Sequence, residues 1–122
     1  MEAILLDKLC RAINSHDLEG IAACFAEDYR CDIPLHPAQS FTGRDQVRAN
    51  WAPLLKGVPD LTAAVARQTV EDGTEWGEWE QRGTVVDGSP HLVRGVVIFT
   101  VASELVQSAR FYLEPVDEGE PA

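Results

Sequence analysis

Cysteine is scarce in this 122-residue chain, and the three present (Cys10, Cys24 and Cys31) form no C-x-x-C pair. An odd, scattered set argues against a disulfide framework or a zinc site and is typical of a reducing cytoplasm. The three histidines are also far apart in the sequence, so they predict no metal centre. We therefore expect neither a metal nor another cofactor.

Basic residues are few as well, with 10 Lys and Arg against 20 Asp and Glu, for a net charge of −10. They are scattered along the chain, and contacts to phosphate need clustered Lys and Arg, so nucleic acid and anionic membranes are disfavoured as partners. No segment approaches the roughly 18 apolar residues of a membrane-spanning helix. The opening MEAILLDKLCRAIN lacks the basic region of a signal peptide. We expect a cytoplasmic protein.

The chain does show a change of periodicity between its two halves. Apolar residues at three- and four-residue steps predict a helix over about 2–14, a short helix capped by Asp17, and a third that opens with a Thr42–Asp45 capping box and ends near Lys56. The second half predicts strands at 61–70, 74–86, 90–102 and 105–116. This pattern indicates a single α+β domain over 1–116, followed by an acidic disordered tail over 117–122.

The pair Asp87-Gly88 favours a two-residue type I′ hairpin between the second and third of these strands. That register places Arg82 opposite Val93 and Trp76 opposite Phe99, so that Trp76, Glu78, Glu80 and Arg82 share a face with Val93, Val97 and Phe99. Both faces are substantially apolar. We therefore expect helices on one side and a second subunit on the other, but periodicity leaves open which face meets the helices.

INSHDLEGIAACFAEDYRCDIP, the helix GRDQVRANWAPLL and the four-strand ending resemble the NTF2-like superfamily, in its SnoaL-like and ketosteroid-isomerase-like bacterial branch. The resemblance covers nearly the whole chain. It implies a curved, mainly antiparallel sheet that wraps three N-terminal helices into a cone with an apolar pocket. It also implies a homodimer through the outer face of the sheet, with Trp79, Arg94, Ile98 and Tyr112 in the interface.

The catalytic residues of the isomerases are not retained. By resemblance, their base position falls on Ile33, their tyrosine donor on Leu9 and their protonated acid on Val97. Three apolar side chains cannot abstract a proton or hold an enolate, so the chain is not expected to be a ketosteroid isomerase. Of the acid–arginine–acid set in the epoxide-hydrolase-like relatives, Glu80 alone is retained.

The resemblance places Trp76, Glu78, Glu80 and Arg82 on the pocket side of the sheet. Two carboxylates about 7 Å apart on one strand face repel each other, so one of them would hold a proton near neutrality. Glu80 and Glu78 are therefore the candidate acid–base pair, with Arg82 as an anchor for an oxyanion or carboxylate, or else as the partner that neutralises them. The candidate ligand-binding residues are Trp51, Trp76, Phe99, Phe111, Leu113, Val97, Ile33 and His36.

Two hypotheses follow. The first is a SnoaL-like protein that binds a small apolar or aromatic metabolite and performs cofactor-free acid–base chemistry of the isomerase, cyclase or dehydratase type. The second is a non-catalytic ligand-binding or dimerisation module. An open cavity reaching Glu78 and Glu80 favours the first, and a glutamate pair locked by Arg82 favours the second.

Overall fold

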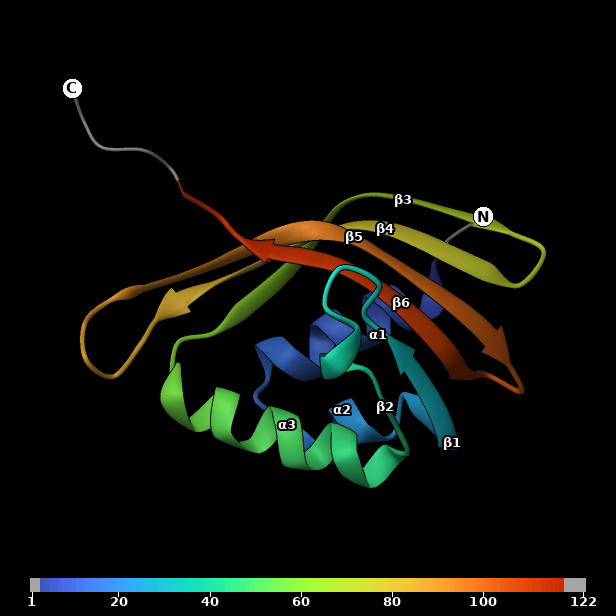
Figure 1. Ribbon diagram of the computed structural model, residues 1–122, viewed down its shortest axis with the longest axis horizontal. Coiled ribbons are helices and arrows are strands. Elements are labelled where there is room, and N and C mark those ends of the chain that lie inside the picture. Colours follow the sequence, from blue (N-terminus) through green and yellow to red (C-terminus); the bar gives the residue numbers. More distant parts are fainter. Residues whose placement is uncertain (1–2, 118–122) are drawn as a thin grey trace.

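A computed structural model of the protein describes residues 3–117 and shows one curved sheet folded over a layer of helices (Figure 1). The sheet order is β2-β1-β6-β5-β4-β3, in which β1 and β6 are parallel and the other neighbours are antiparallel. This is the expected α+β cone. The elements are α1 (Ile4–Asn14), α2 (Leu18–Ala22), β1 (Phe25–Asp32), the 3-10 turn η1 (Pro37–Gln39), β2 (Phe41–Thr42), α3 (Arg44–Gly57), β3 (Thr62–Glu71), β4 (Thr74–Thr84), β5 (Pro90–Ala102) and β6 (Leu105–Pro115).

The helices lie where the apolar periodicity predicts them, although residue 2 of the expected first helix is outside the described residues. Helix α1 buries Leu5, Leu6, Leu9 and Ile13 against the sheet. Asp17 caps α2 by accepting a hydrogen bond from the backbone N–H of Gly20, as expected. Among residues 3–117 the longest helix has 14 residues, and none has the length and hydropathy that a bilayer span requires.

The predicted capping box of the third helix is wrong. Thr42 belongs to β2, and the N-cap of α3 is Gly43, which has a φ of 96° and provides no side-chain hydrogen bond. The helix therefore begins without a side-chain cap. It begins at a glycine, which readily adopts a positive φ. Of the predicted tail over 117–122, only Asp117 is described, and the rest lies outside the described residues.

The N-terminus of α1 is held from across the fold. The carboxylate of Glu75 on β4 accepts hydrogen bonds from the backbone N–H groups of Leu5 (3.0 Å) and Leu6 (2.9 Å). Its side chain is buried, with 5% exposed. A helix N-terminus leaves backbone N–H groups without intrahelical partners and carries a partial positive charge. Glu75 therefore satisfies two such groups and ties the helix layer to the sheet.

The β4–β5 hairpin differs from the predicted register by one residue. A type I′ turn needs positive φ at both of its central residues, and of Asp87 and Gly88 only Gly88, at 90°, has it. The backbone N–H of Val85 instead donates to the carbonyl of Ser89 at 2.8 Å, which leaves residues 86–88 as a three-residue loop. Arg82 consequently pairs with Leu92 and Trp76 with Ile98.

This shift exchanges the two faces of β4, because strand side chains alternate with a period of two. Trp76, Glu78, Glu80 and Arg82 point to the outer face of the sheet, which corrects their predicted place in the cone. The inner face of β4 carries Glu75, Gly77, Trp79 and Gln81. On β5, Val97 and Phe99 are buried under the helices, on the face the resemblance assigned to them.

Candidate functional site

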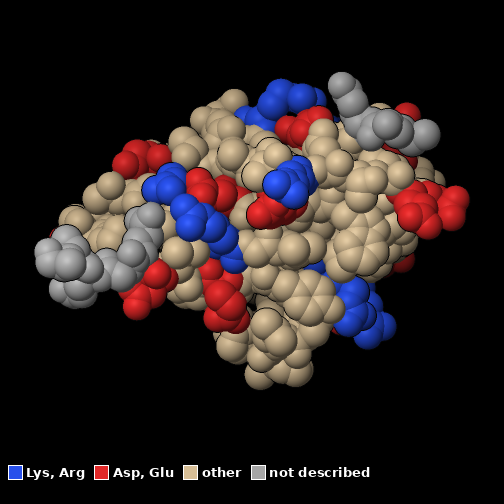
Figure 2. Space-filling view, turned by 90° about the horizontal axis from the view of Figure 1, so that it is seen from above, with Lys and Arg blue, Asp and Glu red and all other residues tan. Residues whose placement is uncertain are grey.

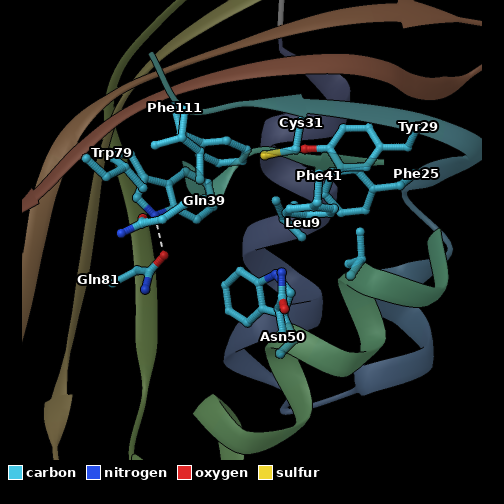
Figure 3. Close-up of a pocket in the computed structure, with 14 residues that line it drawn as sticks. Leu9, Phe25, Tyr29, Cys31, Gln39, Phe41, Asn50, Trp79, Gln81 and Phe111 are labelled. Carbon is cyan, nitrogen blue, oxygen red and sulfur yellow. Dashed lines mark hydrogen bonds between the residues drawn. The ribbon is translucent and has the colours of Figure 1, made fainter. Parts of the chain in front are cut away.

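A cavity of about 220 Å³ lies between the helices and the inner face of the sheet (Figure 3). Its walls come from α1, β1, the segment around η1 and β2, α3, and the C-terminal halves of β4 and β6. The side chains that line it are Leu9, Phe25, Tyr29, Cys31, Ile33, Gln39, Phe41, Val47, Asn50, Trp51, Trp79, Gln81, Phe111 and Leu113.

Aromatic contacts shape the apolar part of the cavity. The rings of Phe25 and Tyr29 are 4.5 Å apart between centroids, and Phe99 contacts both Phe25 and Phe111 edge to face at 6.1 Å. Such offset arrangements are the favourable ones for aromatic rings. Phe99 itself is fully buried behind the lining residues, where its ring packs against that of Phe111.

Two neighbouring groups of β1 supply polarity inside the cavity. The hydroxyl of Tyr29 and the thiol of Cys31 lie next to each other in the cavity wall (Figure 3). Burial raises the pKa of the Tyr29 phenol well above its ordinary value, and burial likewise raises the pKa of the Cys31 thiol. Both groups are therefore protonated at neutral pH, when they can exchange hydrogen bonds with a ligand but cannot serve as anionic bases or nucleophiles.

The opposite wall holds a second polar chain. The indole N–H of Trp79 donates to Oε1 of Gln81 at 2.9 Å, and Nε2 of Gln81 lies 3.4 Å from Nε2 of His91. Asn50 on α3 accepts a hydrogen bond from Gln46 at 2.8 Å. Amides, a hydroxyl, a thiol and two indoles thus make up the polar groups in the walls.

None of the described residues that line the cavity carries a formal charge. The described part of the chain also holds no cluster of three or more His, Cys, Asp or Glu arranged to bind a metal ion. A neutral ligand with a few hydrogen-bonding atoms fits such walls. A charged ligand would lose its hydration without gaining an ionic partner, which is costly.

The predicted acid–base residues lie elsewhere, on the outer face of the sheet, the face that Figure 2 shows from above. There Glu80 is held between two arginines, with Arg82 Nε at 2.7 Å and Arg94 Nε at 2.6 Å from its two oxygens. Oε2 of Glu78 lies 3.9 Å from Nε of Arg67. Acidic and basic side chains are interspersed over this face. The prediction that these residues form the floor of the cone is therefore wrong.

The candidate ligand-binding residues divide into three groups. Trp51, Ile33, Phe111 and Leu113 line the cavity. Val97 and Phe99 belong to the buried core behind it. Trp76 lies on the outer face with 44% exposed, and His36 is exposed on the segment before η1, where its ring pairs with the Glu114 carboxylate of β6.

Of the residues expected in a dimer interface, Arg94, Ile98 and Tyr112 share the outer face with Trp76 and Val96. Trp79 is the exception, because it is buried in the cavity wall with 2% exposed. Trp76 and Val96 are exposed apolar side chains on this face. Dimerisation through it stays a prediction.

Several cavity residues were missed in the sequence. Tyr29 and Cys31 are among them, although they precede the predicted Ile33 at steps of two, a strand signal that indicates one shared face. Trp79 and Gln81 would have been found from the correct hairpin register. Gln39 and Asn50 carry no signal of their own, because a polar residue beside a helix end or on a helix surface is ordinary.

The surroundings of Glu80 give a first testable prediction. Hydrogen bonds from Arg94 and Arg82 lower the pKa of Glu80 below its ordinary value of 4.5, the reverse of what two repelling carboxylates would show. Because its pKa is lowered on folding, the ionised Glu80 with its two arginines stabilises the fold at pH values above the unfolded-state pKa. This stability is lost as the pH falls through the folded-state pKa. A carbon-13 NMR titration should therefore find Glu80 titrating below 4.5, and Arg94→Met should raise its pKa. A wild-type value above 4.5 would contradict this geometry.

Comparison with known proteins assigns the family. The model of the SnoaL-like domain matches residues 6–109, so the chain belongs to the SnoaL-like domain family. This confirms the resemblance to the SnoaL-like branch of the NTF2-like superfamily. No curated protein sequence matches the chain significantly.

Solved structures with the same fold are numerous. A protein with a ketosteroid isomerase-like fold from Catenulispora acidiphila, in complex with trimethylamine, has a TM-score of 0.78 and 14% identity over 92% of this chain and 87% of its own. An NTF2-like protein from Burkholderia pseudomallei has a TM-score of 0.73 and 17% identity over 88% and 86%. Rv0760c from Mycobacterium tuberculosis, in complex with estradiol-17beta-hemisuccinate, has a TM-score of 0.76 and 20% identity over 89% and 90%. At these identities the likeness shows the fold alone.

Proposed function

We propose that the cone cavity binds a small, neutral and largely apolar molecule with one or two hydrogen-bonding atoms. The observation that carries this proposal is the lining itself, which combines aromatic and aliphatic side chains with uncharged polar groups. Ligand sites in proteins commonly have this composition. Two of the structural neighbours were solved with small organic molecules, trimethylamine and estradiol-17beta-hemisuccinate.

The size of the cavity narrows the ligand class. A dry apolar cavity of about 150 Å³ admits benzene. At about 220 Å³, this cavity suits one ring with a short substituent, and a larger molecule would project from its mouth. A monocyclic aromatic compound is therefore the probe to begin with.

Binding without acid–base catalysis is the function that this geometry favours. The cavity walls do not include Glu78 or Glu80, and Glu80 is clamped between two arginines on the other side of the sheet. Inside the cavity, Tyr29 and Cys31 stay protonated at neutral pH. Abstraction of a proton needs a base within hydrogen-bond reach of the substrate, and these walls supply none among the described residues.

Benzamide and benzoate provide a direct test, because they share a shape and differ in charge. We expect benzamide to bind at least about tenfold more tightly than benzoate, because the uncharged cavity offers no partner for a desolvated carboxylate. Isothermal titration calorimetry or ligand-observed NMR measures both affinities. Equal affinities, or a preference for benzoate, would contradict an uncharged site.

A variant that fills the cavity locates the binding. Leu113 lines the cavity, whereas its neighbour Tyr112 points to the outer face of the same strand. Leu113→Trp should abolish benzamide binding, and the matched variant Tyr112→Trp should leave it unchanged. Binding that survives Leu113→Trp and is lost in Tyr112→Trp would place the ligand on the outer face instead.

A further inference from the structure

The orientation of the Gln81 amide is fixed by its neighbour. The indole nitrogen of Trp79 can only donate a hydrogen bond, so the Gln81 atom that lies 2.9 Å from it must be the oxygen. Both side chains are buried, Trp79 with 2% and Gln81 with 7% exposed, so water does not compete freely for this bond. Figure 3 shows the pair side by side at one wall of the cavity, joined by this bond.

With its oxygen bonded to Trp79, the Gln81 amide has its nitrogen left for other hydrogen bonds. Nε2 of Gln81 lies 3.4 Å from Nε2 of His91, a long contact in which the histidine nitrogen must accept because an amide nitrogen only donates. An amide nitrogen carries two hydrogens, so this contact leaves one N–H for another acceptor. Gln81 lines the cavity, and a ligand bound there is the acceptor it can reach.

Asn50, on α3, lacks this fixed polarity. It is bonded to Gln46, and two amides can satisfy each other after both are turned over. The Trp79–Gln81 bond allows no such exchange. Of these two amides, Gln81 is therefore the one whose polarity the surrounding chemistry sets.

We infer that Gln81, held by Trp79, selects ligands that present a hydrogen-bond acceptor, such as a carbonyl or ether oxygen, and discriminates against ligands that present only a donor. The inference rests on the proposed binding function and specifies the polar chemistry of the ligand. A donor-only ligand would bring its N–H or O–H against the N–H of Gln81, and a buried donor without a partner is costly.

Acetophenone and α-methylstyrene test this selection, since they differ in one group, a carbonyl oxygen in place of a methylene. The quantity to measure is the ratio of their dissociation constants, which cancels most of the shared apolar contribution. Gln81→Met keeps the length of the side chain and removes the amide. We expect it to reduce the preference for acetophenone by roughly three- to tenfold, the worth of one neutral hydrogen bond. Gln68→Met, the same substitution on the exposed strand β3, should leave the ratio unchanged.

Trp79→Phe provides an independent variant because it removes the N–H that orients the amide. Gln81 can then turn and present its oxygen, so the preference for indole over indene, which lacks the donor, should rise relative to the wild type. The indole preference of Trp79→Phe also tests whether Gln81 selects acceptor ligands if Gln81→Met does not fold.

The outcomes separate the two claims. Suppose that both probes bind and that the ratio of their dissociation constants is the same in wild type and Gln81→Met. Then the role of Gln81 in selecting acceptor ligands (its selector role) is overturned, while the binding function stands. If Gln81→Met does not fold and Trp79→Phe leaves the indole preference unchanged, the selector role is overturned as well. If neither acetophenone nor α-methylstyrene binds the wild-type protein, the proposed function and the selector role fall together.

Discussion

Glu75→Ala is expected to lower the free energy of unfolding by about 3 kcal/mol, because it leaves two buried backbone N–H groups of α1 without an acceptor. Hydrogen bonds to a charged acceptor are among the stronger ones in proteins, and the two here are 3.0 and 2.9 Å long. The carboxylate also opposes the positive end of the α1 dipole. Losing it should loosen the docking of α1 on β4.

Urea unfolding followed by circular dichroism measures this change. Glu78→Ala is the matched control, since Glu78 lies on the same strand but on the exposed outer face, and it should change stability by no more than about 0.5 kcal/mol. Glu75→Gln should fall between the two, because its amide keeps one acceptor oxygen. Equal losses in Glu75→Ala and Glu78→Ala would refute the assignment of the two faces of β4.

Gly95→Ala is expected to cost about 3 kcal/mol or more, through a direct clash of main chain with the new methyl group. A Cβ at this position would lie 1.8 Å from the carbonyl oxygen of Tyr112 on β6, and the φ of Gly95 is 156°. The obstacle is backbone and not a flexible side chain, so β5 and β6 would have to separate. Glycine is therefore required here for the close approach of β5 to β6.

Gly57→Ala is the control for Gly95→Ala. Gly57 ends α3, and a Cβ added there would meet nothing within 4 Å. Alanine costs less conformational entropy in a helix than glycine, so this variant should be neutral or more stable by up to about 1 kcal/mol. Thermal unfolding of both variants gives the comparison, and a Gly95→Ala protein as stable as Gly57→Ala would show that the β5–β6 approach is looser than described.

Most of the fold could be predicted from local patterns. The four strands of the second half and the cap of α2 by Asp17 depend on residues close in sequence, and these were correct. The family resemblance placed Ile33, Phe111 and Leu113 on the cavity side, where the structure has them.

The candidate site depended on one turn and on the face that the family resemblance assigned to the β4 side chains, and both predictions failed. Asp87-Gly88 matches a two-residue turn, but it occurs here within a three-residue loop, and loops of both lengths use a glycine with positive φ. One residue of slip moved Glu78, Glu80 and Arg82 out of the cone and brought Trp79 and Gln81 into it. Only the residue pairs between β4 and β5 in the folded sheet distinguish these two registers.

Other features join distant parts of the chain and leave no local signal. Glu75 caps α1 across about 70 residues of sequence, and a glutamate within a strand ordinarily points to solvent. The Trp79–Gln81 bond likewise becomes informative only once both side chains are known to face the cavity.

The three tryptophans report directly on whether the ligand binds in the uncharged cavity between the helices and the inner face of the sheet. Trp51 and Trp79 line the cavity, and Trp76 lies on the outer face. In a proton–nitrogen NMR titration with benzamide, the indole signals of Trp51 and Trp79 should shift with saturation while that of Trp76 stays fixed. A saturable shift of Trp76 with Trp51 and Trp79 unmoved would contradict binding in the cavity.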